Sequence, residues 1–479
     1  MRKTVLFTIT IILAGLFFMN VNGFADAAEK IKSSSGAGAE VPDSGFLNEA
    51  VDIFRQYLAI DTTNPPGNEM KTALFLKKIL DREGIENRII DLGSNRANVF
   101  AVVRGNGELK PVVLFHHMDV VSADAGFWTH PPFEAQIANG MIYARGTMDI
   151  KGKGIVDLMT LIYIKRKDIK LKRDIIFLAV SDEESGSIGS KKMIGEYSYL
   201  IKNAEYLLDE GGSITCDDKG EITGVSVSIG EKTPLWLTLT FKGEPGHGSV
   251  PLPDSSVNKA VKAAGNIINR KPEFIILPEL AGMVENAVGV KALEKIPGWK
   301  GNTEESLKNR EFQAELAKDP EINAFMTNTI AVTMLKGSDK VNIIPNEASI
   351  SLDCRLMPGT DKDGFIREIV KLSGDPGVKV SVDEYTPTLS SPADSAMVKA
   401  IAKSVSKKAP GVKTVPVLMF SSTDGSFYRS LGIKSYGFEP YKATKSQYNS
   451  AHGNDERIGV ENFKFGIPLL LDILMELDK

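Results

Sequence analysis

The sequence predicts an α/β fold in which a mostly parallel mixed sheet forms a larger domain that a smaller α+β domain interrupts. Two observations carry this prediction. Short, continuously apolar runs alternate with helix patterns in the first and last parts of the chain, which is typical of a sheet buried on both faces. Between these parts, segments such as PLWLTLTFKG alternate apolar and polar residues, as half-exposed strands do.

The first part of the folded chain begins with two helices. Apolar residues recur at helical spacing from Leu47, near which we expect folded structure to start, to Leu58, and again from Ala73 to Leu80 before Gly84. The remaining elements of this part are the strands NRII, NVFAVV and PVVLF, a helix through Ile155 and Ile162, the strand DIIFLAV, a helix near Lys191 and the strand EYLLD.

The pattern changes at about Thr233 and returns to α/β at about Ser391. The middle part contains the strand PLWLTLTFKG, a helix through Val257 and Ile267, a charge-rich helical insert over about 275–325, and the alternating strands TNTIAVTML and ASISLDCRL. The last part has a helix through Met397 and Val405, the strands TVPVLMF and KSYGF, and a final helix from Glu461. We therefore predict two parts of one domain, 46–232 and 389–479, separated by an α+β insert, 233–388.

The N-terminus has the layout of a secretory signal peptide. Arg2 and Lys3 precede an apolar run of 15 residues, Val5–Met19, which is short for a membrane span, and small residues follow it. We predict a signal peptide over 1–25, with an uncleaved anchor as the alternative, and a flexible linker over 26–45. The protein is then exported, either periplasmic or secreted, with no membrane span in the mature chain. Cys216 and Cys354 are expected to be separate buried thiols, although an oxidising compartment would permit a pair.

The composition excludes several classes of protein. The chain has 57 Lys and Arg against 61 Asp and Glu, a net charge of −4, and no basic stretch beyond the N-terminus, which argues against a nucleic-acid partner. Collagen-like, coiled-coil and disordered proteins differ from it in composition. No G-x-S-x-G, H-E-x-x-H or Walker motif is present.

Metal-type ligands follow three of the predicted buried strands. His117 closes PVVLF and lies two residues before Asp119, Glu183 and Glu184 follow DIIFLAV, and EYLLD ends at Asp209. The carboxyl ends of parallel strands meet at one edge of an α/β sheet, where binding crevices form. Asp149, in YARGTMDIKG, and His452, in YNSAHGNDERI, add a carboxylate and a second imidazole. Taken alone, Asp149 is more typical of a helix cap.

These side chains fit a pair of divalent metal ions. We assign His117 and Asp209 to one ion, Glu184 and His452 to the other, and Asp149 as the bridge between them. Two divalent cations, three carboxylates and a hydroxide are neutral together. Nitrogen and oxygen ligands without thiolate favour Zn²⁺, with Co²⁺ or Mn²⁺ as alternatives. Glu183 is left over and is the natural general base and proton donor.

The ordered motifs resemble metallopeptidase family twenty, which includes carboxypeptidase S, glutamate carboxypeptidase, aminoacylase and acetylornithine deacetylase. The motifs are FHHMDVV, YARGTMDIKG, SDEESGS, LDEGG, GHGSVP, NIIPNEASISLDCRLMPG, STDGSF and AHGNDERI, and the resemblance runs from about residue 47 to the end. It implies a zinc-exopeptidase-type catalytic domain and a lid domain that commonly dimerises. It also implies the ligand set given above, Glu183 as the catalytic glutamate, and Asp119 as the acid that orients His117.

Departures from the family pattern leave some assignments open. His116 stands where the family usually has Gly, so two histidines compete, and the following x-Asp selects His117. In LDEGG either Asp209 or Glu210 could face the metal, and we prefer Asp209. In the lid, His247 matches a residue that reaches the reacting carbonyl, often across a dimer interface. Two further lid residues, Asn328 and Arg355, match substrate contacts.

The resulting hypothesis is an exported dinuclear metallohydrolase that cleaves an amide bond next to a free carboxylate. Its substrates would be peptides, as for a carboxypeptidase or dipeptidase, or N-acyl amino acids. The long insert of the lid resembles the carboxypeptidase S branch and shifts the prediction modestly towards C-terminal peptide or N-acyl-amino-acid cleavage. The alternative is a two-lobed exported protein that binds a ligand through metal without turnover, which would have little reason to keep Glu183.

Overall fold

A computed structural model describes residues 41–479 except 278, and omits the side chain of Asn286. The predicted signal peptide and most of the predicted linker lie outside these residues. The first described helix, α2 (Ser44–Leu58), begins slightly before Leu47, because the carboxylate of Asp43 caps it by accepting from the Phe46 backbone N–H at 2.9 Å. The folded chain therefore overlaps the end of the predicted linker.

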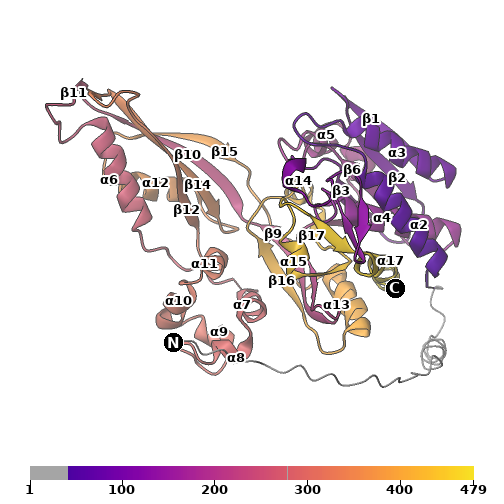
Figure 1. Cartoon of the computed structure of the whole chain (residues 1–479). Coiled ribbons are helices and arrows are strands. Elements are labelled where there is room, and N and C mark those ends of the chain that lie inside the picture. The colour runs from indigo at the N-terminus through magenta and orange to yellow at the C-terminus, as the bar shows by residue number, and fades with distance from the viewer. Residues whose placement is uncertain (1–40, 278) are drawn as a thin grey trace, which may run out of the picture. The chain divides into compact units, whose positions relative to one another are not determined.

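A ten-stranded mixed sheet forms the larger part of the molecule (Figure 1). Its order is β1-β2-β6-β3-β7-β17-β9-β8-β18, and β16 pairs with β9. The strands β6, β3, β7 and β17 are mutually parallel, whereas β1 and β2 join antiparallel. The prediction of a mixed α/β sheet is confirmed. The bounds are β1 (Glu86–Gly93), β2 (Arg96–Val103), β3 (Val112–His117), β6 (Ile175–Val180), β7 (Tyr206–Asp209), β8 (Ile214–Cys216), β9 (Ile222–Glu231), β16 (Thr414–Met419), β17 (Lys434–Gly437) and β18 (Lys442–Thr444).

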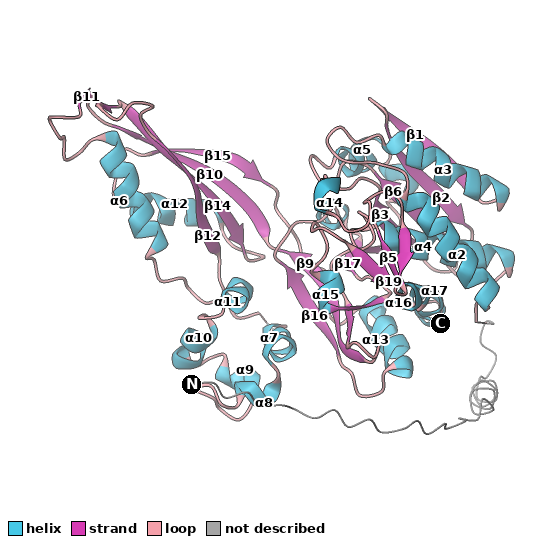
Figure 2. Cartoon of the chain, in the orientation of Figure 1, coloured by secondary structure: helices cyan, strands magenta, loops and turns pink. Residues whose placement is uncertain are grey.

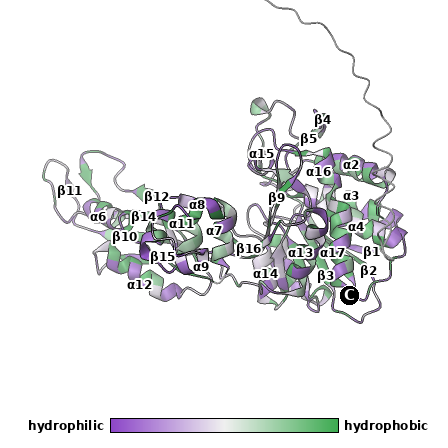
Figure 3. Cartoon of the chain, turned by 90° about the horizontal axis from the view of Figure 1, so that it is seen from below, coloured by the Kyte–Doolittle hydropathy of each residue, from purple (hydrophilic) through white to green (hydrophobic). Residues whose placement is uncertain are grey.

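Both faces of this sheet are buried under helices. In β3, Val112 and Leu114 belong to one apolar core, and Val113 and Phe115 to another, as alternate residues of a strand should. The first core includes α3 (Glu69–Arg82), α4 (Lys151–Arg166), α13 (Ala396–Lys408) and α17 (Gly466–Leu477), and the second includes α5 (Ile188–Glu196) and α14 (Gly425–Ser430). The residues of α17 are mainly hydrophobic (Figure 3). Where we predict a single helix from Glu461, the structure has two helices, α16 (Val460–Lys464) and α17.

A four-stranded sheet, which we call the lid sheet, forms the middle part of the chain (Figure 2). Its order is β12-β14-β10-β15, and α6 and α12 cover one face. The predicted helical insert is present as α7 to α11. The bounds are β10 (Thr233–Lys242), α6 (Ser256–Ile268), α7 (Leu280–Val288), α8 (Val290–Leu293), α9 (Thr303–Ser306), α10 (Arg310–Leu316), α11 (Pro320–Met326), β12 (Thr329–Lys336), β14 (Glu347–Leu356), α12 (Lys362–Ser373) and β15 (Lys379–Tyr385). Residues 42–479 form one compact unit, so the domain boundaries stay predictions.

Small elements complete the described chain. They are η1 (Ala125–Phe127), β4 (Gln136–Ala138), β5 (Met141–Tyr143), η2 (Ser198–Leu200), β11 (Gly246–His247), β13 (Ile343–Ile344), α15 (Lys445–Tyr448) and β19 (Arg457–Gly459). Cys216 and Cys354 are separate buried thiols, as expected. Within residues 41–479, no helix has both the length and the apolar character that a membrane crossing requires.

Candidate metal centre

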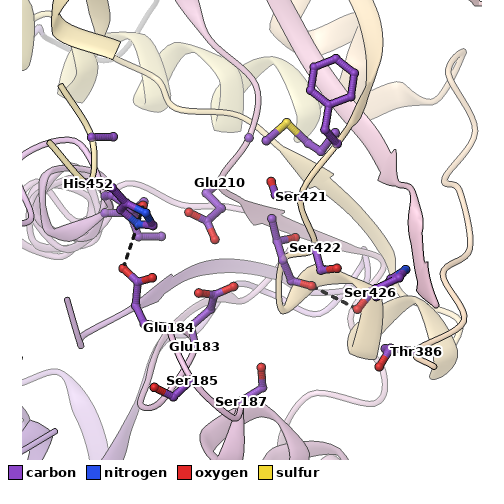
Figure 4. A pocket seen from close by; sticks show the side chains of 18 of the residues that line it. Glu183, Glu184, Ser185, Ser187, Glu210, Thr386, Ser421, Ser422, Ser426 and His452 are labelled. Atoms are coloured by element: carbon purple, nitrogen blue, oxygen red, sulfur yellow. Dashed lines mark hydrogen bonds and ion pairs between the residues drawn. The ribbon is translucent and has the colours of Figure 1, made fainter. Parts of the chain in front are cut away.

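The order of the parallel strands brings the predicted ligands together. β6, β3 and β7 are neighbours in the sheet, so the residues at their carboxyl ends meet at one edge. His117 is the last residue of β3, Glu183 and Glu184 lie just beyond β6, and Glu210 directly follows β7. In Figure 4 the carboxylates of these three glutamates gather around one space, with the His452 imidazole beside it.

Asp149 connects the two imidazoles. Its Oδ1 lies 2.9 Å from His117 Nε2 and its Oδ2 lies 2.8 Å from His452 Nε2. His452 Nε2 also lies 3.3 Å from Glu184 Oε1. A carboxylate that reaches both histidines with different oxygens has the position of a bridging ligand, and it is not the helix cap that Asp149 resembles in isolation.

Glu210, rather than Asp209, faces His117. Glu210 Oε2 lies 3.8 Å from His117 Nε2, whereas Asp209 Oδ2 accepts a hydrogen bond of 2.8 Å from the Gly425 backbone N–H. Asp209 is the last residue of β7 and its side chain is committed to the neighbouring chain segment. We therefore correct the sequence-based preference: Glu210 has the position of the ligand, and Asp209 supports the strand end.

The neighbours His116 and Asp119 have different structural roles beside His117. The ring of His116 is fully buried with Nε2 2.9 Å from the Tyr57 hydroxyl, so it is a core histidine. His117 Nδ1 lies 3.0 Å from the backbone carbonyl oxygen of Asp119 and 3.6 Å from the side-chain Oδ1 of Asp119. Because Nδ1 has these partners, Nε2 is the ring atom left for a metal. The Asp119 carboxylate also accepts from the backbone N–H groups of Glu183 and Glu184, at 3.1 and 3.2 Å. Asp119 thus positions the loop of the predicted base as well as the histidine.

The donor atoms fit divalent cations. His117, Asp149 and Glu184 form one group whose ligand atoms lie within 4.8 Å of one another, and His117, Glu183 and Glu210 form a second. Oxygen and imidazole nitrogen donors are a set that Zn²⁺ accepts. The second group places the Glu183 carboxylate at ligand distance from His117 and Glu210.

The protonation equilibria of the centre reflect its crowded acids. Burial opposes the charge on His117, yet Asp119, Asp149 and Glu210 raise its pKa well above the ordinary value. The pKa of His452 is raised to about 10 by its hydrogen bonds with Asp149 and Glu184. Burial and the nearby Glu210 raise the pKa of Glu183 well above the ordinary range. The buried carboxylates therefore attract positive charge, which divalent cations would supply.

Two supporting groups were not found from the sequence. Glu456 is fully buried, pairs with Arg145 at 2.6 Å, and accepts from the backbone N–H groups of Met148 and Asp149 at 2.7 and 3.2 Å. Asn64 donates to the carboxylates of Asp119 and Asp182 at 2.7 and 2.9 Å. Their motifs, NDERI and TTNPPGNE, are polar stretches beside predicted elements, and that polarity was the available signal.

A cavity of about 850 Å³ contains the centre and extends to the lid sheet. Arg355 lines it and pairs with Asp353 at 2.8 Å. Among the described residues that line this cavity, His247 and Asn328 are absent. The Asn328 side chain instead accepts from the Met357 backbone N–H at 2.7 Å, and His247 is exposed on β11 at the end of the lid. Within one chain, therefore, these two expected substrate contacts do not reach the centre.

An α/β sheet with imidazoles and carboxylates at its strand ends fits a metal-dependent hydrolase. The model of peptidase family M20/M25/M40 matches residues 113–476, and the chain belongs to this family. The predicted family and the predicted class of enzyme are thereby confirmed.

Relatives agree with this assignment. The chain is 28% identical over 383 residues to the N-fatty-acyl-amino acid synthase/hydrolase PM20D1.1 of Danio rerio, covering 77% of this chain and 73% of that protein. It is 25% identical over 434 residues to aminoacylase-1 of Mus musculus, covering 89% and 95%. Among solved structures, the M20 family metallo-carboxypeptidase Sso-CP2 from Sulfolobus solfataricus has a TM-score of 0.66 and 20% identity, covering 90% of this chain and 99% of that one.

Proposed function

We propose that this protein is an exported dinuclear metallohydrolase that cleaves an amide bond next to a free carboxylate, in peptides or in N-acyl amino acids. The observation that carries the proposal is Asp149, whose two oxygens contact the imidazoles of His117 and His452. We assign His117, Asp149, Glu184, Glu210 and His452 as the ligands. Zn²⁺ is the proposed metal, with Co²⁺ or Mn²⁺ as alternatives. The proposal that the protein is exported rests on the signal-peptide-like sequence of residues 1–25.

Glu183 is the proposed general base. Bound divalent cations would polarise the scissile carbonyl and make a water molecule more acidic. Glu183 would take the proton of that water and later deliver it to the departing nitrogen. Asp119 fixes the Glu183 backbone N–H, so the base is held at a defined place. Its burial beside Glu210 supports a carboxyl group able to hold a proton.

The lid would bind the rest of the substrate. Arg355 lines the cavity and offers a planar guanidinium to a free carboxylate, a geometry that allows two parallel hydrogen bonds. His247 would act from a second copy of the chain, in a homodimer formed through the lid, and donate a hydrogen bond to the reacting oxygen. The alternative of a binding protein without turnover has less support, because the chain belongs to a hydrolase family and keeps Glu183.

The test combines turnover with metal analysis. Purified protein is assayed against blocked dipeptides with a free C-terminus and against N-acyl amino acids, with metal content measured on the same samples. We expect Glu183→Gln to lower kcat by at least about 100-fold, the usual size of a general-base effect, and to keep two ions per chain. The exposed Glu196→Gln is the control. Loss of one ion in Glu183→Gln would make it a ligand, and unchanged kcat would end the base assignment.

A further inference from the structure

A second cavity of about 520 Å³ opens beside the metal centre. Gly211, Met419, Glu439 and Tyr448 line both cavities, so the two spaces adjoin. Cys216 also lines the second one. None of the described residues that line the second cavity comes from the lid sheet, although Arg355 of that sheet lines the first. The second cavity, which we call the side cavity, is therefore formed by the ten-stranded sheet, its connecting loops and α15, without the lid sheet.

Glu439 lies where the two cavities adjoin. It follows β17, the fourth of the parallel strands, so it lies at the same sheet edge as the ligands that follow β6, β3 and β7. The residue is only 9% exposed, and its Oε2 has no hydrogen-bond partner within the described chain. A buried carboxyl oxygen without a hydrogen-bond partner lowers the stability of the folded protein. Such a group calls for a functional explanation, and a bound ligand that donates a hydrogen bond would provide one.

The surroundings of Glu439 supply little compensation. Burial raises its pKa to about 8, and the nearby Tyr441 hydroxyl and Gly211 backbone only partly oppose this increase. Asp149 lies close enough to add to the increase. The mechanism proposed above assigns Glu439 no task.

We propose that Glu439 and the side cavity form the subsite for the acyl-side residue of a peptide substrate. Glu439 accepts a hydrogen bond from the nitrogen on the α-carbon of that residue, and the side cavity holds its apolar side chain. This inference rests on the proposed function and names its substrate class as peptides, in preference to amino acids that carry a simple acyl chain.

The arrangement follows from the place of the scissile bond. Its carbonyl would lie at the metal centre, with the free carboxylate directed to Arg355 on the lid side. The acyl part must then extend away from Arg355, and the side cavity has no residue from the lid sheet. The α-nitrogen is separated from the carbonyl carbon by a single carbon atom. A group that lines both cavities, as Glu439 does, is placed to meet it.

A simple acyl chain is the less suitable occupant. It would fill the apolar space but would leave the Glu439 oxygen unpaired and further removed from water. Sites built to hydrogen-bond an N–H group discriminate strongly against analogues that lack it, because the polar group of the protein is then left without a partner.

The experiment compares two probes that differ in one group. Leucyl-leucine and N-(4-methylpentanoyl)-leucine are identical except for the α-ammonium group, and N-acetyl-leucyl-leucine offers an amide N–H in its place. We expect the wild type to cleave leucyl-leucine with a kcat/KM at least about tenfold above that for the 4-methylpentanoyl compound. The N-acetyl peptide decides whether a neutral N–H is sufficient. Equal rates for the first two probes, or a preference for the simple acyl compound, would overturn the proposal.

Variants of Glu439 test whether this residue causes the preference for leucyl-leucine. We expect Glu439→Leu to bring the two kcat/KM values within about threefold while cleavage of the acyl compound continues, and Glu439→Gln, whose amide oxygen still accepts, to keep part of the preference. Glu384→Gln, a lid carboxylate at the first cavity, is the matched control and should leave the preference as in the wild type. A full preference in Glu439→Leu would contradict the assignment. Failure to cleave any amide substrate would refute the proposed function instead.

Discussion

Single residues decide how the metal centre is built, and adjacent residues differ completely in role. His116 and Asp209 are buried in protein contacts, whereas their neighbours His117 and Glu210 face the centre. Sequence reasoning prefers His117 because Asp119 follows at a suitable spacing, and it is the His117 ring that lies beside Asp149. It cannot separate Asp209 from Glu210, because both are carboxylates at one strand end and only the Gly425 backbone N–H, far away in the chain, distinguishes them.

The pair Asp209 and Glu210 gives a prediction at this scale. We expect Glu210→Gln to weaken the binding of one ion by about 10- to 100-fold, because it removes a charged donor beside His117. Asp209→Asn should keep both ions, and because its amide oxygen can still accept from the Gly425 N–H, it should cost no more than about 1 kcal/mol of stability. Chelator competition and thermal unfolding measure the two effects. Normal affinity in Glu210→Gln together with loss of an ion in Asp209→Asn would restore the original assignment.

At the level of elements, the sequence predicts the strands whose apolar or alternating runs are clearly bounded, but it misses β9 and β15. The pattern places metal-type ligands after β3, β6 and β7, and the sheet topology then shows that these three strands are neighbours whose carboxyl ends meet. What the pattern does not contain is pairing between distant segments. Glu456 and Arg145 are a buried ion pair 311 positions apart, and neither lies on an apolar periodicity that would have connected them. The division of the last predicted helix into α16, VENFK, and α17, GIPLLLDILMEL, was also missed.

Lys232 joins β9 to β10 and gives a prediction about pH. Its ammonium is buried and donates to the carbonyl oxygens of Ala324 and Thr327 at 3.1 and 2.9 Å. Burial lowers its pKa to about 7 from the ordinary 10.5, and Arg355 and Arg270 add to this. Between these pH values the unfolded chain binds more protons at Lys232 than the folded chain does. The free energy of unfolding therefore has its full value, as far as this group is concerned, above about pH 10.5, and it decreases as the pH falls towards 7.

The matching variant is Lys232→Met, which cannot titrate. The free energy of unfolding of the wild type, minus that of the variant, should grow by about 2–4 kcal/mol between pH 7 and pH 10, at 1.36 kcal/mol for each unit of pKa shift. Urea unfolding at a series of pH values measures it, with the exposed Lys403→Met as the control. Parallel pH profiles for wild type and Lys232→Met would show that the buried amine keeps its ordinary pKa.

For the whole molecule, the described chain leaves two expected substrate contacts, His247 and Asn328, outside the cavity of the centre. His247 lies on β11, and nearby lid elements expose Val261 and Ile268 on α6 and Leu335 on β12, at 54%, 69% and 51%. Exposed apolar side chains of this kind often mark an interface between proteins. They support the proposed homodimer through the lid, in which each copy would complete the site of the other.

Complementation tests this assembly. His247→Ala and Glu183→Gln chains are inactive separately under the proposal, but a mixed dimer has one site with an intact Glu183 and the partner's intact His247. Random exchange should then restore about a quarter of wild-type activity, since half of the dimers are mixed and one of two sites works in each. Leu335→Glu should prevent both dimer formation and this recovery. No recovery from dimers shown to be mixed would mean that His247 does not act across an interface.

The most direct test of the central claim is the titration of metal-free protein with Zn²⁺, followed by calorimetry, for the wild type and for Asp149→Ala. Within residues 41–479 as described, Asp149 is the residue whose carboxylate contacts both imidazoles, so its removal should affect both ions. We expect two ions per wild-type chain and a large loss of affinity for both in the variant. Binding of two ions by Asp149→Ala with wild-type affinity, or no binding by the wild type, would contradict it.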